Sequence, residues 1–504
     1  MPPLHEDPYD VSMSLISPDS GFEDEQSNGK TEMGSCGAFG VVINVIVGTG
    51  FFAVPYTFYH SGLPLSIGLT LISAVFAILC AIWVLENVAR ARGLDTARKY
   101  GIRHTSDLNQ FTFRQIEYSE SSKIFSGKVG EWFCHIVFLF YAVGSLWAYV
   151  SMFSSTSANL IMKYIVQDPE DCIIELNPSS LCFFSYCIST IVLAVIVLIL
   201  ELFDMGKMAF IQTFFTIYRF VAFGLIFVSC IVSLVYNGSP WLNPPESTLS
   251  DPHLHPKWYS VEMSGFPGLF SSVSFAFTCS YNLPNILTPM KRGKKAAAKA
   301  TVLAITSSAV IYIALAVLLP MALGGDVLQY VILNWARYGR RGFTPLTSDD
   351  AALHGVQPVE TNWISQIVKF GVMLFPMLNM ISTYPLVAGS IGYSFYSALP
   401  KSLQVKCGRF GPLLFRYIVT VPPFVLGLIM PSLGIIVKFC GLSAIFLVIF
   451  IPAVFHMYSK RVCKEEWRTP YSGWWSHNIF AIFAILYGAF ALVYGIIRFI
   501  IDLL

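Results

Sequence analysis

Charged residues are scarce in this chain of 504 residues. Only 12% of the residues are Asp, Glu, Lys or Arg, whereas 55% are hydrophobic. Soluble domains usually contain about 25% charged residues, so the composition excludes an ordinary soluble enzyme and indicates an integral membrane protein. The formal net charge of +2 shows no basic excess, and we therefore expect no nucleic acid partner. We expect the lipid bilayer to surround most of the chain.

Motifs typical of enzymes and metal sites are also missing. The sequence contains no HExxH, no GxSxG and no CxxC pattern, so we expect neither a catalytic centre nor a zinc site. Among the 11 cysteines, Cys172 and Cys182 flank one loop between apolar stretches. They could form a disulfide if that loop faces an oxidising compartment, and otherwise both would remain thiols.

Eleven apolar stretches are long enough to cross a bilayer, which takes about 20 helical residues. A helix satisfies its own backbone hydrogen bonds in hydrocarbon, so the sequence predicts an all-α polytopic membrane protein. The predicted spans are 37–59, 65–85, 131–153, 181–203, 208–236, 264–288, 300–323, 362–384, 415–430, 434–458 and 480–501.

The basic residues outside these spans predict the orientation of the chain. Of the Lys and Arg residues there, 22 lie on the side of the N-terminus and 5 on the opposite side. The positive-inside rule therefore places the N-terminus in the cytoplasm, and eleven spans place the C-terminus outside or in a lumen. Both the plasma membrane and an endolysosomal or vacuolar membrane fit this topology.

Two segments outside the spans carry further predictions. Residues 1–35 are acidic, and we expect a disordered cytoplasmic tail that could bind a cytoplasmic partner. Asn237 begins an Asn-Gly-Ser sequon on the non-cytoplasmic side and is a predicted glycosylation site. Pro240 directly after the sequon weakens it as an acceptor.

Two of the predicted spans are interrupted by residues that helices tolerate poorly. The first contains Gly48, Gly50 and Pro55, and the sixth contains Pro284. Interruptions at corresponding places in two five-helix blocks indicate an inverted-repeat transporter with a binding site near the bilayer midplane. The first repeat would cover 37–236 and the second 264–458 of a transmembrane domain over 36–504, with an extra helix at 480–501. The alternative is a pair of glycine kinks that let helices pack closely.

An unwound backbone in hydrocarbon needs partners for its free peptide groups, because each unpaired group costs several kcal/mol. The N-terminus of a half-helix suits a carboxylate, and the C-terminus suits an ammonium group or a cation. An amino acid carries both groups on one small molecule.

At these interruptions the sequence resembles the amino acid/auxin permease family of the amino acid–polyamine–organocation superfamily. The likeness covers residues 36–500, and the sequence resembles in particular a transmembrane protein 104-like branch of the family. It implies eleven helices, a LeuT-like five-plus-five inverted repeat with discontinuous helices 1 and 6, and secondary transport of amino acids. The motifs that carry it are Asn44-x3-Gly48-Thr49-Gly50-x4-Pro55-x6-Gly62, Phe275-Ala-Phe277-x-Cys279, Ser382-Thr383-Tyr384-Pro385, Leu287-Thr288-Pro289 and Leu333-Asn334-Trp-Ala-Arg337.

The resemblance also implies which residues would bind the substrate. Backbone amides of Gly48, Thr49 and Gly50 would bind the carboxylate. The substrate's amino group would be bound by carbonyl groups, and the pocket walls would be aromatic. The residues implied for these two roles are Phe277, Thr278 and Cys279 for the carbonyls, and Tyr149 and Tyr281 for the walls.

A sodium ion is the one ligand beside the substrate that the resemblance suggests. Asn44 and Thr383 match positions that hold sodium in sodium-coupled relatives, with Ser382 adjacent and the carbonyl of Val47 nearby. Oxygen ligands of this kind suit a hard cation. The alternative for Thr383 is a hydroxyl group that bonds to the backbone of its own helix.

Arg219 complicates sodium coupling. It lies about eleven residues into the fifth span, about 16 Å deep at 1.5 Å per residue, and a charge at that depth must find a partner. In some members of the superfamily a basic residue on this helix takes the place of sodium, so we expect no sodium coupling if Arg219 reaches Asn44 and Thr383. The alternative is a structural arginine satisfied by carbonyl groups.

Acidic residues are absent from the middle of every predicted span. Glu86, Glu131, Glu201, Asp204 and Asp502 all lie at span ends or just beyond them. We therefore expect no carboxylate relay for protons. We likewise expect His135, at the start of the third span, and His456, at the end of the tenth, to be interfacial histidines with satisfied hydrogen bonds and not proton carriers.

The sequence thus predicts a secondary active transporter of small neutral amino acids that works by alternating access and is not an enzyme. A sodium symporter is one form of this prediction. The alternative from another class is a nutrient sensor or scaffold that binds an amino acid but moves little of it.

Overall fold

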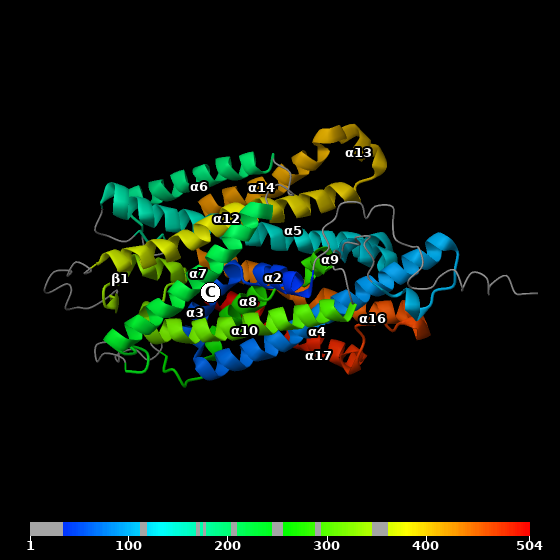
Figure 1. Cartoon of the computed structure of the whole chain (residues 1–504), viewed down its shortest axis with the longest axis horizontal. Coiled ribbons are helices and arrows are strands. Elements are labelled where there is room, and N and C mark those ends of the chain that lie inside the picture. Colours follow the sequence, from blue (N-terminus) through cyan, green and yellow to red (C-terminus); the bar gives the residue numbers. More distant parts are fainter. Residues whose placement is uncertain are drawn as a thin grey trace, which may run out of the picture.

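The computed structural model describes residues 34–110, 118–167, 172–174, 178–202, 209–243, 256–287, 294–344 and 361–503. The acidic residues 1–33 lie outside this part of the chain, so the predicted tail stays a prediction. Figure 1 shows long helices that run roughly along the longest axis of the molecule, with connecting segments gathered at the two ends.

The first half of the described chain contains nine helical elements. They are α2 (Ser35–Ile46), η1 (Thr49–Ala53), α3 (Val54–Ser61), α4 (Leu63–Tyr100), η2 (Ser106–Leu108), α5 (Tyr118–Ile161), η3 (Met162–Val166), α6 (Ser180–Leu200) and α7 (Ala209–Asn237).

The second half contains further helices and one short hairpin. Its helices are η6 (Met263–Gly265), α8 (Phe266–Ala276), η7 (Ser280–Asn282), α9 (Leu283–Leu287), α10 (Lys294–Leu323), η8 (Gly324–Asp326), η9 (Val331–Arg337), α12 (Trp363–Ala398), α13 (Lys401–Cys407), η10 (Gly408–Phe410), α14 (Gly411–Ile429), α15 (Leu433–Ile445), η11 (Phe446–Phe450), α16 (Ile451–Cys463), η12 (Lys464–Glu466), η13 (Trp474–Ser476) and α17 (Asn478–Leu503). The strands β1 (Tyr338–Gly339) and β2 (Gly342–Phe343) pair antiparallel, with Tyr338 opposite Phe343.

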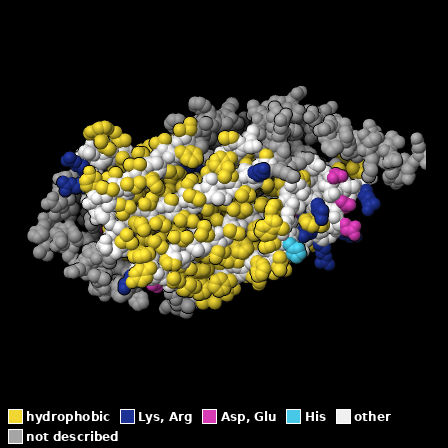
Figure 2. Space-filling model, turned by 60° about the horizontal axis from the view of Figure 1, so that its bottom comes forward, with side chains coloured by type: hydrophobic (Ala, Val, Ile, Leu, Met, Phe, Trp, Pro, Cys, Tyr) yellow, Lys and Arg dark blue, Asp and Glu magenta, His cyan; other side chains and the backbone are white. Residues whose placement is uncertain are grey.

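Nine helices in the described residues are long and apolar enough to cross a membrane, or ten if one bent pair counts as a single span. Large apolar side chains cover the outside, for example Val75, Phe483 and Leu486, each more than half exposed. Figure 2 shows a broad face of such side chains, with charged groups mainly toward the ends of the long axis. A helical, polytopic membrane protein is therefore confirmed, whereas eleven spans and the direction of the termini stay predictions.

Several helices are longer than the spans predicted for them. Helix α4 has 38 residues and α5 has 44, whereas about 20 residues cross the bilayer. Hydropathy marks only the part of a helix that lies in lipid, so the predicted spans 65–85 and 131–153 missed the extensions. Helix α5 contains a kink at Gly127, whose φ of 65° favours glycine.

The bent pair is the first predicted span. Helix α2 ends at Ile46, and its axis makes an angle of 46° with the following helical segment Gly50–Ser61. The backbone amides of Val47 and Gly48 donate to the carbonyls of Ile43 and Ile46, each at 2.8 Å, which closes a tight turn. Pro55 then lies at the start of α3, where the missing N–H costs no helical hydrogen bond.

A similar interruption follows α8. This helix ends at Ala276, and the 3-10 turn η7 begins only at Ser280. The backbone angles of Cys279, φ −130° and ψ −18°, lie outside the helical region. The hydroxyl group of Thr278 donates to the carbonyl of Ser274 at 2.7 Å, which satisfies one acceptor of the last turn of α8.

The two interruptions touch at Gly50. A Cβ atom on Gly50 would lie 2.5 Å from Cα and 2.7 Å from N of Ala276, the last residue of α8. A Cβ atom on Gly48 would meet nothing closer than the carbonyl oxygens of Val45 and Ile46, at 3.8 and 3.9 Å. Glycine is therefore a steric requirement at position 50, whereas a Cβ atom at position 48 would make only ordinary van der Waals contacts.

We expect the Gly50→Ala variant to unfold at a lower temperature than the unaltered protein. The new methyl group would overlap the backbone of Ala276, and overpacking of this kind costs about 1–3 kcal/mol. Thermal unfolding of the full chain in detergent measures the effect. The Gly48→Ala variant is the matched control and should melt close to the unaltered protein. Equal melting temperatures for both variants would contradict the close packing of the two interruptions.

Candidate functional site

Tyr312 joins the ends of both interrupted helices. It lies on α10 and is 1% exposed. Its hydroxyl group donates to the carbonyl of Ile46 at 2.6 Å and lies 3.4 Å from the carbonyl oxygen of Ala276. These carbonyls end α2 and α8, where the helix dipoles place partial negative charge. The meeting point of the two helix ends therefore favours hydrogen-bond donors and positive groups.

Aromatic rings pack closely around this hydroxyl group. The ring of Phe51 stacks on that of Tyr312 with centroids 6.0 Å apart, and Phe277 lies 5.6 Å from Tyr312. Phe223 from α7 meets Phe51 edge to face at 5.3 Å. These rings fill the space on one side of the helix ends and exclude water there.

The two tyrosines predicted as pocket walls lie on the side toward α5. Tyr281 packs against Tyr141 and Phe138 of α5, with ring centroids 5.6 and 5.8 Å away. Tyr149, also on α5, lies within electrostatic range of Tyr281 and 6.4 Å from the ring of Tyr384 on α12. The structure thus places both side chains near the interruption that follows α8.

Arg219 reaches the first interruption from α7. Its guanidinium group donates one hydrogen bond to the backbone carbonyl of Asn44 and another to Oδ1 of Asn379 on α12. The side chain is 4% exposed, and Tyr149 and Tyr312 both lie within electrostatic range. Arg219 therefore links α2, α7 and α12 beside Asn44, one of the two residues that match sodium-binding positions.

Two buried polar atoms at this place have no hydrogen-bond partner. They are Oδ1 of Asn44, an acceptor, and Nε of Arg219, a donor. Roughly 90% or more of buried polar groups in proteins are paired, so this acceptor and this donor are free to bind a further polar molecule. A zwitterion could satisfy both.

Some of the predicted ligand groups are already engaged. The amide of Gly48, expected to bind a carboxylate, donates to Ile46 instead, because the turn that ends α2 needs a donor there. The carbonyl of Cys279 accepts from the amide of Asn282 at 3.1 Å. The hydroxyl group of Ser382 donates to the carbonyl of Asn379 at 2.9 Å. These groups could bind a ligand only by exchanging partners.

The remaining predicted site residues are placed as follows. The carbonyl-bearing Val47 is 1% exposed and ends α2, and Thr383 lies on α12 and is partly exposed. The backbone of Thr49 belongs to η1, and its side chain lies outside the described residues.

The structure describes both the cysteine pair Cys172 and Cys182 and the predicted glycosylation site Asn237. Cys172 and Cys182 form a disulfide with their Cα atoms 5.5 Å apart. The side-chain amide of Asn237 donates to the carbonyl of Phe343 at 3.2 Å and lies 3.4 Å from Oγ of Ser233. A glycan on Asn237 would have to replace these contacts, and glycosylation stays a prediction.

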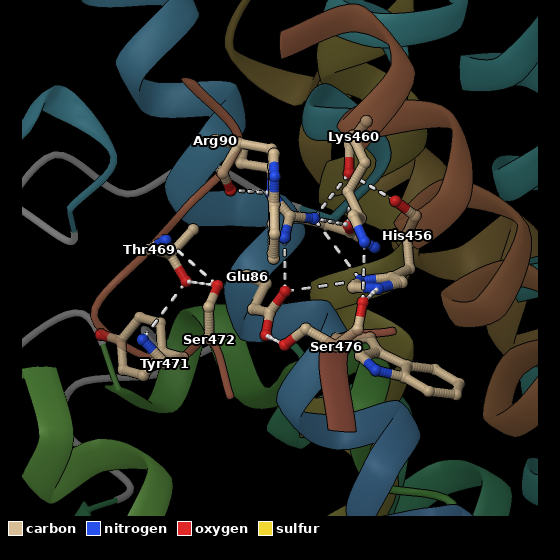
Figure 3. A network of polar contacts seen from close by, with 12 residues as sticks. Glu86, Arg90, His456, Lys460, Thr469, Tyr471, Ser472 and Ser476 are labelled. Atoms are coloured by element: carbon tan, nitrogen blue, oxygen red, sulfur yellow. Dashed lines mark hydrogen bonds and ion pairs between the residues drawn. The ribbon is translucent and has the colours of Figure 1, made fainter. Parts of the chain in front are cut away.

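A second polar cluster, which the sequence analysis missed, lies between α4 and α16 (Figure 3). Glu86 accepts hydrogen bonds from Arg90 and from the hydroxyl group of Ser476, and His456 Nδ1 lies 3.5 Å from Glu86 Oε2. Glu86, Arg90 and His456 are completely buried. The spacing of four residues between Glu86 and Arg90 is a helical ion-pair signal that the sequence offered.

This second cluster is saturated with contacts. The amino group of Lys460 donates to the carbonyl of Ser476 at 2.9 Å and lies 4.1 Å from the ring centroid of Trp467. Arg90 Nε donates to the carbonyl of Trp467 at 2.7 Å. The cluster therefore fastens the segment before α17 to α4 and α16. Among the described residues, no group of three or more His, Cys, Asp or Glu side chains is arranged to hold a metal ion.

Comparisons with known proteins agree with this architecture. A family model described as "Transmembrane amino acid transporter protein" matches residues 33–501. Proteins called transmembrane protein 104 homolog from Caenorhabditis briggsae and Caenorhabditis elegans are each 25% identical over 359 residues, which are 69% of this chain and 65% of each relative. The homolog from Drosophila melanogaster is 21% identical over 484 residues, which are 84% of this chain and 88% of the relative. The chain thus spans slightly less than two thirds of the Caenorhabditis relatives.

Two solved structures share the fold. MhsT, in complex with L-phenylalanine, superimposes with a TM-score of 0.54 at 14% identity, over 92% of this chain and all of that chain. The manganese transporter of Eremococcus coleocola, in complex with an aromatic bis-isothiourea compound, gives 0.53 at 13% identity, over 95% of this chain and 90% of that chain. Both are helical membrane transporters of the LeuT-like fold, which this chain therefore shares.

We expect the Arg219→Met variant to be markedly less stable than the unaltered protein. It leaves the carbonyl of Asn44 and Oδ1 of Asn379 without a donor, and each unsatisfied buried group costs about 1–3 kcal/mol. Adding Asn379→Leu removes one of the two orphaned acceptors and should recover part of the loss. Thermal unfolding of the single and double variants tests this, and strictly additive losses would contradict a direct Arg219–Asn379 bond.

Proposed function

We infer the function from one premise: the chain belongs to the transmembrane amino acid transporter family, whose model matches residues 33–501. We propose that it is a secondary active transporter of small neutral amino acids that works by alternating access. The substrate site would lie where the interrupted first and sixth spans meet. The observation that carries this proposal is the pair of unpartnered atoms beside two helix ends joined by one tyrosine hydroxyl group.

Both charged ends of an amino acid find complementary groups there. The carbonyl ends of α2 and α8 and Oδ1 of Asn44 suit an ammonium group. The amides of Thr49 and Gly50 begin the next helical segment and suit a carboxylate. The amide of Gly48 would join them only by leaving the carbonyl of Ile46.

The surroundings favour a small side chain without charge. The rings of Phe51, Phe277 and Tyr312 already pack against one another and leave little room for a bulky group. A cationic substrate would meet the positive charge of Arg219, and none of the described residues that form the two interruptions is acidic. A small apolar or hydroxylated side chain fits these surroundings best.

The position of Arg219 supports transport without sodium. Its guanidinium group donates to the backbone carbonyl of Asn44 and to the amide oxygen of Asn379, which places a positive charge beside Asn44, one of the residues matched to sodium-binding positions. In this proposal the hydroxyl group of Thr383 stabilises helix packing and binds no ion.

We expect the purified protein in liposomes to accumulate at least one small neutral amino acid, at the same rate in sodium as in choline medium. Uptake of a panel of radiolabelled amino acids measures this directly. The Gly48→Leu variant should lose uptake by about tenfold or more, because a leucine side chain at the first interruption would occupy the proposed substrate site. Sodium-independent uptake by the unaltered protein and loss of uptake in the Gly48→Leu variant should be observed with the same amino acid, because both depend on one substrate site.

The matched control is Gly40→Leu, on the same helix α2 and with nothing within 4 Å of its Cβ position. It should retain uptake. Full uptake by the Gly48→Leu variant would contradict the location of the site. If uptake required sodium, and the Thr383→Ala variant no longer responded to sodium, the proposal that Arg219 replaces a sodium ion would be contradicted. Saturable binding without any uptake would instead indicate a sensor.

A further inference from the structure

Three carboxylate side chains are buried among the described residues: Glu86, Glu131 and Glu201, with 0%, 8% and 2% exposure. Glu86 forms an ion pair with Arg90. Glu131 accepts from the amino group of Lys123 at 2.9 Å. In the described part of the chain, no Lys, Arg or His nitrogen forms an ion pair with the carboxylate of Glu201. Glu201 is therefore the exception that needs an explanation.

Glu201 lies directly after α6, under cover of α14 and α12. The hydroxyl group of Thr420 on α14 donates to its Oε1 atom, whereas its Oε2 atom is buried and has no hydrogen-bond partner. Among the residues that the structure describes, Arg416 on α14 is the cation in electrostatic range, and its Nη1 atom donates to the backbone carbonyl of Glu201 at 3.2 Å, not to the carboxylate. Tyr384 on α12 and Tyr417 on α14 are the other described titratable groups in electrostatic range.

A buried carboxylate in these surroundings is more stable with a proton than without one. Moving an ionised carboxylate into a medium of low dielectric constant without a close counter-ion is very costly, and such groups usually take up a proton instead. One hydroxyl donor, and a guanidinium group that bonds the backbone carbonyl and not the carboxylate, offset only part of that cost. In the neutral form, Oε1 still accepts from Thr420, and Oε2 carries the hydrogen atom.

Contacts between neighbouring helices lead from Glu201 to the substrate site. Thr420, which donates to Glu201, accepts through its own carbonyl from the hydroxyl group of Tyr384 at 2.9 Å. The ring of Tyr384 lies 6.4 Å from that of Tyr149, and Tyr149 lies within electrostatic range of Arg219. Arg219 in turn donates to Asn44 at the end of α2. A change around Glu201 can thus reach the first interruption through α14, α12, α5 and α7.

We propose that Glu201 is a proton-binding site whose occupancy is coupled to amino acid transport. This inference rests on the proposed function. It names the proton as the ion that drives transport, in place of the sodium ion that the proposed function leaves out. The carboxylate holds a proton while α6, α12 and α14 enclose it. When these helices separate and water reaches Glu201, the carboxylate becomes stable in its charged form and releases the proton on the side of the N-terminus.

The sequence analysis expected no carboxylate relay because every acidic residue lies at the end of a span. Position along the chain is a poor guide to burial at this point, because Thr420 and Tyr384 come from helices more than 180 residues away in the sequence. Their packing over the end of α6 encloses Glu201. His135 is also buried with an unpaired Nδ1 atom, but a neutral imidazole needs no compensating charge.

The test compares Glu201→Gln with the unaltered protein in liposomes, because glutamine keeps the shape of the protonated side chain. An inward proton gradient should raise uptake by the unaltered protein several-fold. The Glu201→Gln variant should lose this stimulation and still exchange labelled for unlabelled amino acid, which needs no net proton movement. Glu131→Gln is the matched control, a buried carboxylate with a cation partner, and should keep the stimulation.

Stimulation retained by Glu201→Gln, or lost in His135→Gln but not in Glu201→Gln, would overturn the assignment. Exchange by the unaltered protein without any response to a proton gradient would overturn the coupling while leaving the proposed function intact. An infrared difference spectrum at neutral pH gives a readout independent of transport. The band of a protonated carboxyl group should be present in the unaltered protein and missing in Glu201→Gln, and identical spectra would refute proton binding at Glu201.

Discussion

A helix that is interrupted inside a bilayer must find partners for the carbonyl groups at its broken end, and most of the site architecture described here follows from that constraint. The hydroxyl group of Tyr312 reaches the last carbonyl of α2 and lies close to that of α8. Arg219 takes a third carbonyl, that of Asn44. The interruptions approach closely enough to share one tyrosine only because position 50 has no side chain. Loss of any of these contacts would leave acceptors unpaired where water is scarce, so the geometry and its partners are interdependent.

Buried charged groups in this structure fall into two classes, those with a full set of polar partners and those with an incomplete set. Around Glu86 and Arg90 every charged group has close partners, and the cluster holds α4, α16 and the segment before α17 together. Around Arg219 and Glu201 the partnering is incomplete, since Nε of the arginine and Oε2 of the glutamate have no partner. Saturated clusters are typical of structural joints, whereas unsatisfied buried groups persist where a ligand or proton binds. This contrast is the physical basis for assigning a functional role to the surroundings of Arg219 and Glu201 and a structural role to the Glu86–Arg90 cluster.

The sequence was sufficient for what depends on composition and local chain chemistry. Apolar stretches predicted a helical membrane protein, and Gly48, Gly50 and Pro55 lie in the segment where α2 ends and the chain bends before α3. The depth of Arg219 predicted that it needs a partner, but not that Asn379, 160 residues away, would provide one. The same limit hid the cluster of Glu86 and His456 and the burial of Glu201. These features depend on which distant helices pack together, and a single sequence carries little information about such packing.

The central claim is that an amino acid occupies the meeting point of α2 and α8 beside Arg219. A density map of the full chain in lipid, recorded with a transported amino acid, tests it most directly. The account predicts ligand density with the ammonium group at Oδ1 of Asn44 and the carboxylate toward the amides that follow Gly48, and no cation density between Asn44 and Thr383. Density for the amino acid elsewhere, or a continuous first helix with no ligand beside it, would contradict the account.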